Sequence, residues 1–149
     1  MTMRSVPVFL TLLAVVAGAR AQKSIEALKA EAAKASGAHQ AKIYAELAES
    51  LVERANGEFN GGESVKAHAT VQEILDDATK AHDGALSTKS NRKEVEILLR
   101  NTQRHLENVK RTLAAEDRPD LDAVEKKLEQ FRQDLLDAMF ADPKKREGK

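Results

Sequence analysis

The chain has 149 residues, among them 24 basic and 24 acidic residues, four histidines, no cysteine and no tryptophan. This charge balance argues against a nucleic-acid-binding protein, which would need a broad basic face. The lack of cysteine excludes disulfides, thiol chemistry, cysteine-ligated zinc, iron–sulfur clusters and covalently attached c-type haem.

The first 21 residues are typical of a secretory signal peptide. Arg4 precedes an apolar run, and Ala19-Arg20-Ala21 fits the small-x-small cleavage pattern. We therefore predict a signal peptide over residues 1–21 and a mature chain that starts at Gln22. The alternative is an uncleaved N-terminal anchor or a buried helix. An exported domain without cysteine must be held together by packing alone, which favours a bacterial periplasmic or secreted protein.

The segment from Lys23 to Ala35 is rich in alanine and has high helix propensity, but it carries few large apolar side chains. Ser24 is suited to cap its N-terminus, and Ser36-Gly37 is a place for a kink or a break. A helix this short is marginal in water by itself. We expect it to extend the next helix as one long rod that is mobile at its free end. The alternatives are docking on a partner or on a second copy of the chain.

Two amphipathic helices are predicted next. From His39 onward the apolar residues form a wide stripe, which ends at Asn60-Gly61-Gly62 because glycine tolerates the left-handed conformation of a helix C-terminus. The following helix runs from about Glu63 to Leu86. The stripe of the first helix comprises Ile43, Tyr44, Leu47, Ala48, Leu51, Val52, Ala55 and Phe59, and that of the second comprises His68, Val71, Leu75, Ala78, His82 and Ala85.

A third helix begins near Asn91, which has capping-box spacing to Glu94, and its apolar stripe continues to Leu113. The next turn offers Asp117 or Asp120 as the cap of a fourth helix, with Pro119 in its first turn. This helix has the most regular stripe of the chain, with spacings of three and four residues: Leu121, Val124, Leu128, Phe131, Leu135 and Ala138.

Together these elements predict an all-α protein. Four helices of similar length with short connections favour an antiparallel up-down-up-down helical bundle over residues 22–141. A looser array of helical hairpins is the alternative. Asp142-Pro143 ends the last helix, and residues 142–149 are expected to form a disordered charged tail.

Part of the chain resembles a tetratricopeptide helix hairpin. Ala41, Tyr44, Leu47 and Ala48 match the first helix of that repeat, and Gly62 followed by Ala67 matches a later step. The chain departs from the pattern in two ways: Gly62 lies 14 residues after Ala48, which is too far, and no second copy follows at the period of about 34 residues. The resemblance implies a helical-repeat module for protein–protein interaction.

The histidines are the main candidates for a metal or haem site. His68 and His82 share one stripe but stand four helical turns apart, about 21 Å, so they cannot ligate one metal ion. No Glu-x-x-His motif of a di-iron bundle is present. We expect each histidine to lie at the edge of a stripe with one ring nitrogen in water. The alternative is a haem- or metal-binding bundle with one histidine as a ligand.

The charged clusters have structural interpretations. Acidic pairs occur at Asp76-Asp77, Glu116-Asp117 and Asp120-Asp122, of which the last two are expected to cap the fourth helix. The third helix carries a basic row with interleaved glutamates, which indicates a solvated face with helical ion pairs. A docking surface for an acidic partner or anionic lipid is the alternative. The row comprises Arg92, Lys93, Arg100, Arg104, Lys110 and Arg111.

No motif indicates a nucleophile, a phosphate-binding loop or a zinc-protease site, so no catalytic residue, cofactor site or metal ligand set is predicted. We expect an exported, non-enzymatic helical protein of the bacterial cell envelope with a binding or scaffold role. Its partner would be another envelope protein or a second copy of itself, with no nucleic acid and no membrane span in the mature chain. The alternatives are the tetratricopeptide-like module and the haem- or metal-binding bundle.

Overall fold

The computed structural model describes residues 23–141, and over this range the chain is helical with no strand. The all-α prediction is therefore confirmed. The predicted signal peptide and charged tail lie outside the described residues. None of the described helices is long and apolar enough to span a bilayer. The elements in order are α1 (Ile25–Lys34), α2 (Gly37–Asn60), α3 (Ser64–Thr88), α4 (Arg92–Thr112), a 3-10 turn η1 (Ala115–Asp117) and α5 (Arg118–Phe140).

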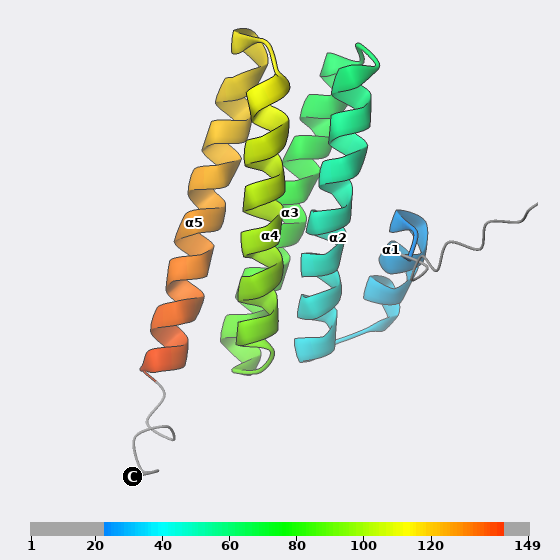
Figure 1. Ribbon diagram of the computed structural model, residues 1–149. Helices are drawn as coiled ribbons and strands as arrows, with labels where there is room; N and C mark the ends of the chain where they lie inside the picture. The colour runs from blue at the N-terminus through cyan, green and yellow to red at the C-terminus, as the bar shows by residue number, and fades with distance from the viewer. Residues whose placement is uncertain (1–22, 142–149) are drawn as a thin grey trace, which may run out of the picture.

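The four long helices form two hairpins that pack against each other. Successive helices alternate in direction, and α1 lies apart from the others beside α2 (Figure 1). The most extensive contact is between α2 and α3, followed by that between α4 and α5. Across the hairpins, α2 lies against α4 and α3 lies against α5, whereas the consecutive helices α3 and α4 touch only slightly. The link from α3 to α4 therefore crosses the bundle.

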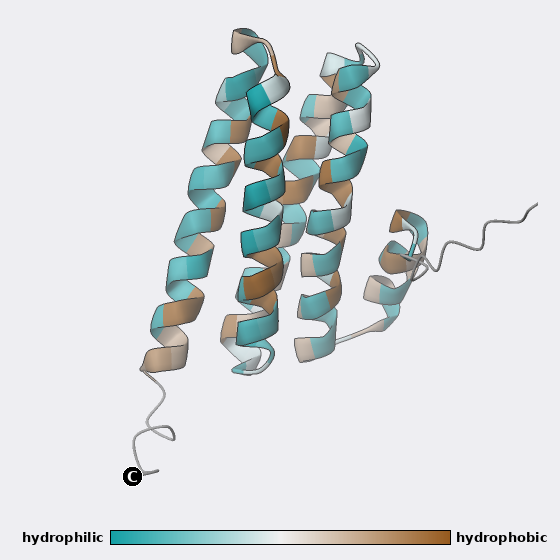
Figure 2. Cartoon of the chain, viewed as in Figure 1, coloured by the Kyte–Doolittle hydropathy of each residue, from teal (hydrophilic) through white to brown (hydrophobic). Residues whose placement is uncertain are grey.

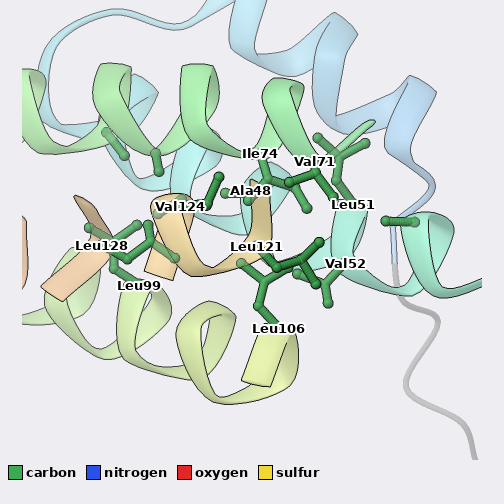
Figure 3. Packing of buried hydrophobic residues seen from close by; sticks show 14 of the residues in the cluster. Ala48, Leu51, Val52, Val71, Ile74, Leu99, Leu106, Leu121, Val124 and Leu128 are labelled. Atoms are coloured by element: carbon green, nitrogen blue, oxygen red, sulfur yellow. The ribbon is translucent and has the colours of Figure 1, made fainter. Parts of the chain in front are cut away.

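The core follows the predicted stripes. Hydrophobic residues recur along each helix between hydrophilic stretches, as Figure 2 shows. On α5, Leu121, Val124, Leu128 and Leu135 are buried, as the spacing of the last stripe predicts. Side chains from all four long helices meet in the interior, where Leu51, Ile74, Leu99, Leu106, Leu121 and Leu128 are among those drawn in Figure 3.

The α2–α3 pair is close because its seam is built largely from alanine. A Cβ atom added at Gly84 would lie 2.9 Å from the Cβ atom of Ala41, closer than two carbon atoms can approach without a shift. The small residues of the two helices therefore also set the spacing of this hairpin. The buried alanines of the pair are Ala41, Ala45, Ala48, Ala55, Ala67, Ala78, Ala81 and Ala85.

Three predictions about helix ends have different outcomes. The Oγ atom of Ser24 accepts a hydrogen bond from the Ala27 amide at 3.1 Å, so the predicted cap of α1 is confirmed. The capping box at Asn91 is wrong: Asn91 has a φ of 55°, and its side-chain amide donates to the Ala38 carbonyl at 3.0 Å instead. The carboxylate of Asp117 makes no capping hydrogen bond either, because it faces a histidine of α3.

The prediction of one long rod at the N-terminus is also wrong. Helix α1 ends at Lys34, Ala35 and Ser36 are extended, and Gly37 has a φ of 60°, which favours glycine. The chain folds back so that α1 packs on α2. The physical reason is burial: docking removes a small apolar face of α1 from water, which an isolated rod would leave exposed.

Candidate functional site

The site begins with the packing of α1 on the outer face of α2. Leu28 and Ala32 of α1 and Ile43 and Leu47 of α2 are each at most 3% exposed, and they form an apolar cluster beside the main core. The partly buried Ile25 and Tyr44 pack against both. Leu28 and Ala32 are four residues apart and so lie on one face of α1. We call this contact the α1 seam. The stripe of α2 was predicted to be wide, and the seam is the reason, because α2 has apolar partners on two sides.

Polar contacts fix the position of α1 on the seam. The Lys29 Nζ atom lies 2.5 Å from an oxygen of Glu73 on α3, so α1 is tied to the second helix of the hairpin as well. The Gln40 side chain donates a hydrogen bond of 2.9 Å to the Ala32 carbonyl near the C-terminus of α1. Both partners of the ion pair are partly exposed, which limits the pair to less than about 1 kcal/mol.

A buried carboxyl group borders the seam. Asp77 of α3 is only 6% exposed, and its Oδ2 atom has no hydrogen-bond partner. The nearest cation is Lys80, whose Nζ atom lies 3.8 Å from the Asp77 Oδ1 atom and 4.9 Å from the centre of the Tyr44 ring. Burial raises the pKa of Asp77 from 3.8 to about 6, and the charges of Lys80 and Lys29 oppose this shift only partly.

Asp77 lies on the wall of a small hollow between α1, α2 and α3. The hollow has a volume of about 270 Å³ and is lined from α1 by Lys29, Ala32 and Ala33. Its remaining walls carry Tyr44, Leu47, Glu73, Asp76, Asp77 and Lys80. The acidic pair Asp76-Asp77 was noted in the sequence without a role. Asp77 stands three residues after Ile74 and next to Ala78, so its place on the buried face could have been found from helical spacing.

The histidines of α3 are each held between two carboxylates. The Nε2 atom of His68 lies 2.9 Å from Asp117 and its Nδ1 atom lies 2.9 Å from Asp120, although only the first contact is aligned as a hydrogen bond. The ring nitrogens of His82 lie 2.8 Å from Asp83 and 3.1 Å from Asp134. The expectation that one nitrogen of each ring faces water is therefore wrong for these two residues.

Aromatic rings complete both histidine environments. The ring of His82 stacks on Phe131 of α5 with 4.4 Å between ring centres, and the rings of His68 and Phe59 of α2 form a T-shaped pair with 5.2 Å between centres. The two histidines thus tie α3 to α5 and to the turn that precedes it. Within residues 23–141 no cluster of three or more potential ligands could hold a metal ion. His39 and His105, by contrast, are exposed.

Three acidic residues at the N-terminal end of α5 have side-chain partners rather than free backbone amides of the helix. Asp117 and Asp120 face His68, and Asp122 lies 2.8 Å from the Lys110 Nζ atom. The prediction that these groups cap the last helix is wrong, because side chains of α3 and α4 compete successfully for them. His68 and Lys110 are brought near these carboxylates by tertiary packing, so the local sequence around the turn could not predict the contacts.

Two residues of the basic row of α4 form the helical ion pairs that the sequence predicts. Arg100 pairs with Glu96 at 2.8 Å and Arg111 pairs with Glu107 at 2.9 Å. Arg92 donates to the carbonyls of Ala85 and Leu86 at the end of α3 and of Ala138 near the end of α5. Its guanidinium therefore satisfies the free carbonyls of two helices at once.

A second, larger hollow lies between α2 and α4. It has a volume of about 490 Å³ and a mixed lining, whose polar side chains include Glu49, Glu53, His105 and Asn108. These four side chains are all at least partly exposed. No charged residue of its lining is buried, so this hollow would select the chemistry of a ligand less strictly than the α1 seam does.

Comparison with known proteins found no matching family model, curated protein or solved structure.

Proposed function

We propose that this protein is an exported, non-enzymatic binding protein of the bacterial cell envelope, and that it binds a helix of its partner at the α1 seam. The observation that carries the proposal is that the buried residues of the seam form a cluster of their own, which the partly buried Ile25 and Tyr44 link to the main core. The bundle of α2–α5 has its own interior, so α1 occupies the seam much as a bound helix occupies a groove. The up-down-up-down bundle expected from the sequence would serve as a rigid scaffold for this surface.

The contacts of α1 define the chemistry of a suitable partner. The partner helix needs a leucine and, four residues later, a small residue, because Leu28 and Ala32 are the side chains buried on the seam. A lysine directly after the leucine would meet Glu73, as Lys29 does. The acidic residues Asp76 and Asp77 next to this position favour a helix with positive charge along one edge.

Export of the protein is part of the proposal and is supported by the sequence alone. The first 21 residues have the features of a signal peptide, and the absence of cysteine suits a domain that is stabilised by helix packing. In this setting the partner would be another envelope protein, or a second copy of the chain.

A peptide-binding experiment tests the proposal. The Leu28→Asp substitution places a charge in the apolar seam and should detach α1, with a loss of about 3 kcal/mol in docking free energy. A labelled peptide that covers residues 23–36 should then bind the variant saturably. The wild type should bind it at least about tenfold more weakly, because its own α1 competes. The Ala27→Asp variant, altered at an exposed position of α1, is the matched control and should behave like the wild type.

Two measurements decide the outcome. Circular dichroism and urea unfolding establish that the Leu28→Asp variant keeps a cooperative bundle. If this folded variant shows no saturable binding of the peptide, the seam is not a helix-binding site and the proposal is wrong.

A further inference from the structure

The segment that joins α1 to the bundle is built like a hinge. Only Ala35 and Ser36 separate the two helices, and both residues are extended. Gly37 follows with a φ of 60°, and a Cβ atom added there would meet no atom closer than 3.9 Å. If these three residues became helical, α1 and α2 would form one helix from Ile25 to Asn60, about 54 Å long at 1.5 Å per residue.

Such a long helix would leave two complementary apolar surfaces uncovered. Leu28 and Ala32 would project beyond the bundle, and Ile43 and Leu47 would lose their cover. A second copy in the same state would carry the same pair of surfaces. The principle of domain exchange is that every contact made within one chain can form between two identical chains.

The register of the α1 seam is compatible with this exchange. Helix α1 folds back on α2, so residues on either side of the hinge face each other in order, with Ala32 near Gln40 and Leu28 near Ile43 and Leu47. Two long helices related by a two-fold axis through Ser36 would place the same residues opposite each other. The two bundles would then extend in opposite directions from the axis, with α1 of each chain on the seam of the other.

We propose that the partner at the α1 seam is α1 of a second copy, and that two chains form a dimer by reciprocal exchange of this helix. This inference rests on the proposed function, since it names the occupant of the same seam. The pair Lys29–Glu73, which forms within one chain, would form across the interface of the dimer together with the apolar contacts of the exchanged helix. The linker of two residues is too short for α1 to reach a second chain as long as the hinge is folded back. The hinge must therefore straighten before the helices can exchange.

Substitution of the hinge glycine tests the exchange. Gly37→Ala disfavours the left-handed conformation of the folded-back hinge and favours a continuous helix, which together shift the hinge equilibrium by about tenfold or more. Because a dimer contains two hinges, its association constant should rise about 100-fold. Light scattering over a concentration series of the mature chain should show the variant at twice the monomer mass under conditions where the wild type is mainly monomeric.

The matched control is Gly62→Ala. Gly62 has a φ of 75° and open space around it, but it lies in the turn between α2 and α3 rather than beside α1. This variant should lose stability without a change in oligomeric state. If Gly37→Ala folds cooperatively but stays monomeric, or if Gly62→Ala dimerises equally, the exchange is wrong.

A charge-reversal pair then identifies the contact. In the Gly37→Ala background, Lys29→Glu and Glu73→Lys each place like charges on the seam of their own dimers. A mixed dimer restores opposite charges at both seams. Native mass spectrometry should therefore show mixed dimers at about two thirds of all dimers or more, above the statistical half. A statistical mixture would show that the dimer uses another surface, which overturns the proposal.

Failure of the exchange can be distinguished from failure of the proposed function. If the peptide binds the Leu28→Asp variant while Gly37→Ala remains a monomer, the seam accepts helices but not from a second copy. If the peptide does not bind, the helix-binding function itself is wrong, whatever the mass of the Gly37→Ala variant.

Discussion

The buried carboxyl group of Asp77 makes the stability of the fold depend on pH in a defined direction. Its pKa is raised from 3.8 to about 6, so the folded chain holds this proton more tightly than the unfolded chain does. The stabilising contribution is complete below about pH 4 and is lost as the pH rises through about 6. Above that range the folded protein must keep a charge in a poorly solvated place with one oxygen unpaired.

The Asp77→Asn substitution isolates this effect. A shift of about two pKa units corresponds to at most about 3 kcal/mol, because each unit is worth about 1.4 kcal/mol. The difference in unfolding free energy between the variant and the wild type should therefore rise by up to that amount from pH 4 to pH 7.5. Urea unfolding at both pH values, followed by circular dichroism, gives the two differences directly.

The neighbouring residue supplies the control. Asp76 is exposed on the same turn of α3, so Asp76→Asn changes the net charge equally without affecting a buried group. It should alter the pH dependence by less than about 0.5 kcal/mol. If Asp77→Asn and Asp76→Asn shift the pH dependence equally, or if neither does, burial does not control the titration of Asp77 and the reasoning is refuted.

Further predictions concern the other tertiary contacts and the leader. His82→Ala should lower the unfolding free energy by about 2 kcal/mol in urea, because it removes a buried ring from Phe131 and leaves a cavity, whereas the exposed His39→Ala should have no effect. Arg92→Met should cost about 1–3 kcal/mol through the lost carbonyl hydrogen bonds, and Lys93→Met, at an exposed neighbouring position, should cost almost nothing. After expression with its leader in a bacterial host, intact mass should give a mature chain that begins at Gln22; retention of residues 1–21 would contradict the signal-peptide prediction.

Sequence periodicity was sufficient for the elements of the core. The stripe of α5 predicted its buried face because a helix with three- and four-residue spacing has one apolar side, and this relation depends on local sequence only. The helix class followed from the same regularity on α2, α3 and α4. The cross-bundle link between α3 and α4 could not be predicted from this regularity, because a stripe shows which face of a helix is buried but not which helix covers that face.

The α1 seam shows where local reasoning stops. Helix propensity predicts helix on both sides of Ser36-Gly37, so it cannot distinguish a straight rod from a folded-back pair. The decision is made by tertiary burial of Leu28 against Ile43 and Leu47. The width of the α2 stripe was the available signal. An apolar face that is broader than one packing partner can cover indicates that a further helix packs on it.

The same limit applies to the side chains that bridge helices. His68 and Asp117 are 49 residues apart, and His82 and Asp134 are 52 apart, so no local pattern links them. Asp117 was assigned to a helix cap because capping is the nearest use for a carboxylate at that position. Packing brought a histidine within reach, and the carboxylate faces that ring instead.

The central claim is that α1 is a separately docked helix on a bundle that is stable without it. Hydrogen exchange of the monomeric mature chain, measured with increasing low concentrations of urea, tests this most directly. The amides of residues 28–34 should exchange together through an opening of low free energy that hardly depends on urea, while the core amides of α2–α5 exchange only through global unfolding. If the α1 amides were as well protected as those of the core and opened only with the whole bundle, α1 would be part of the core and the claim would be contradicted.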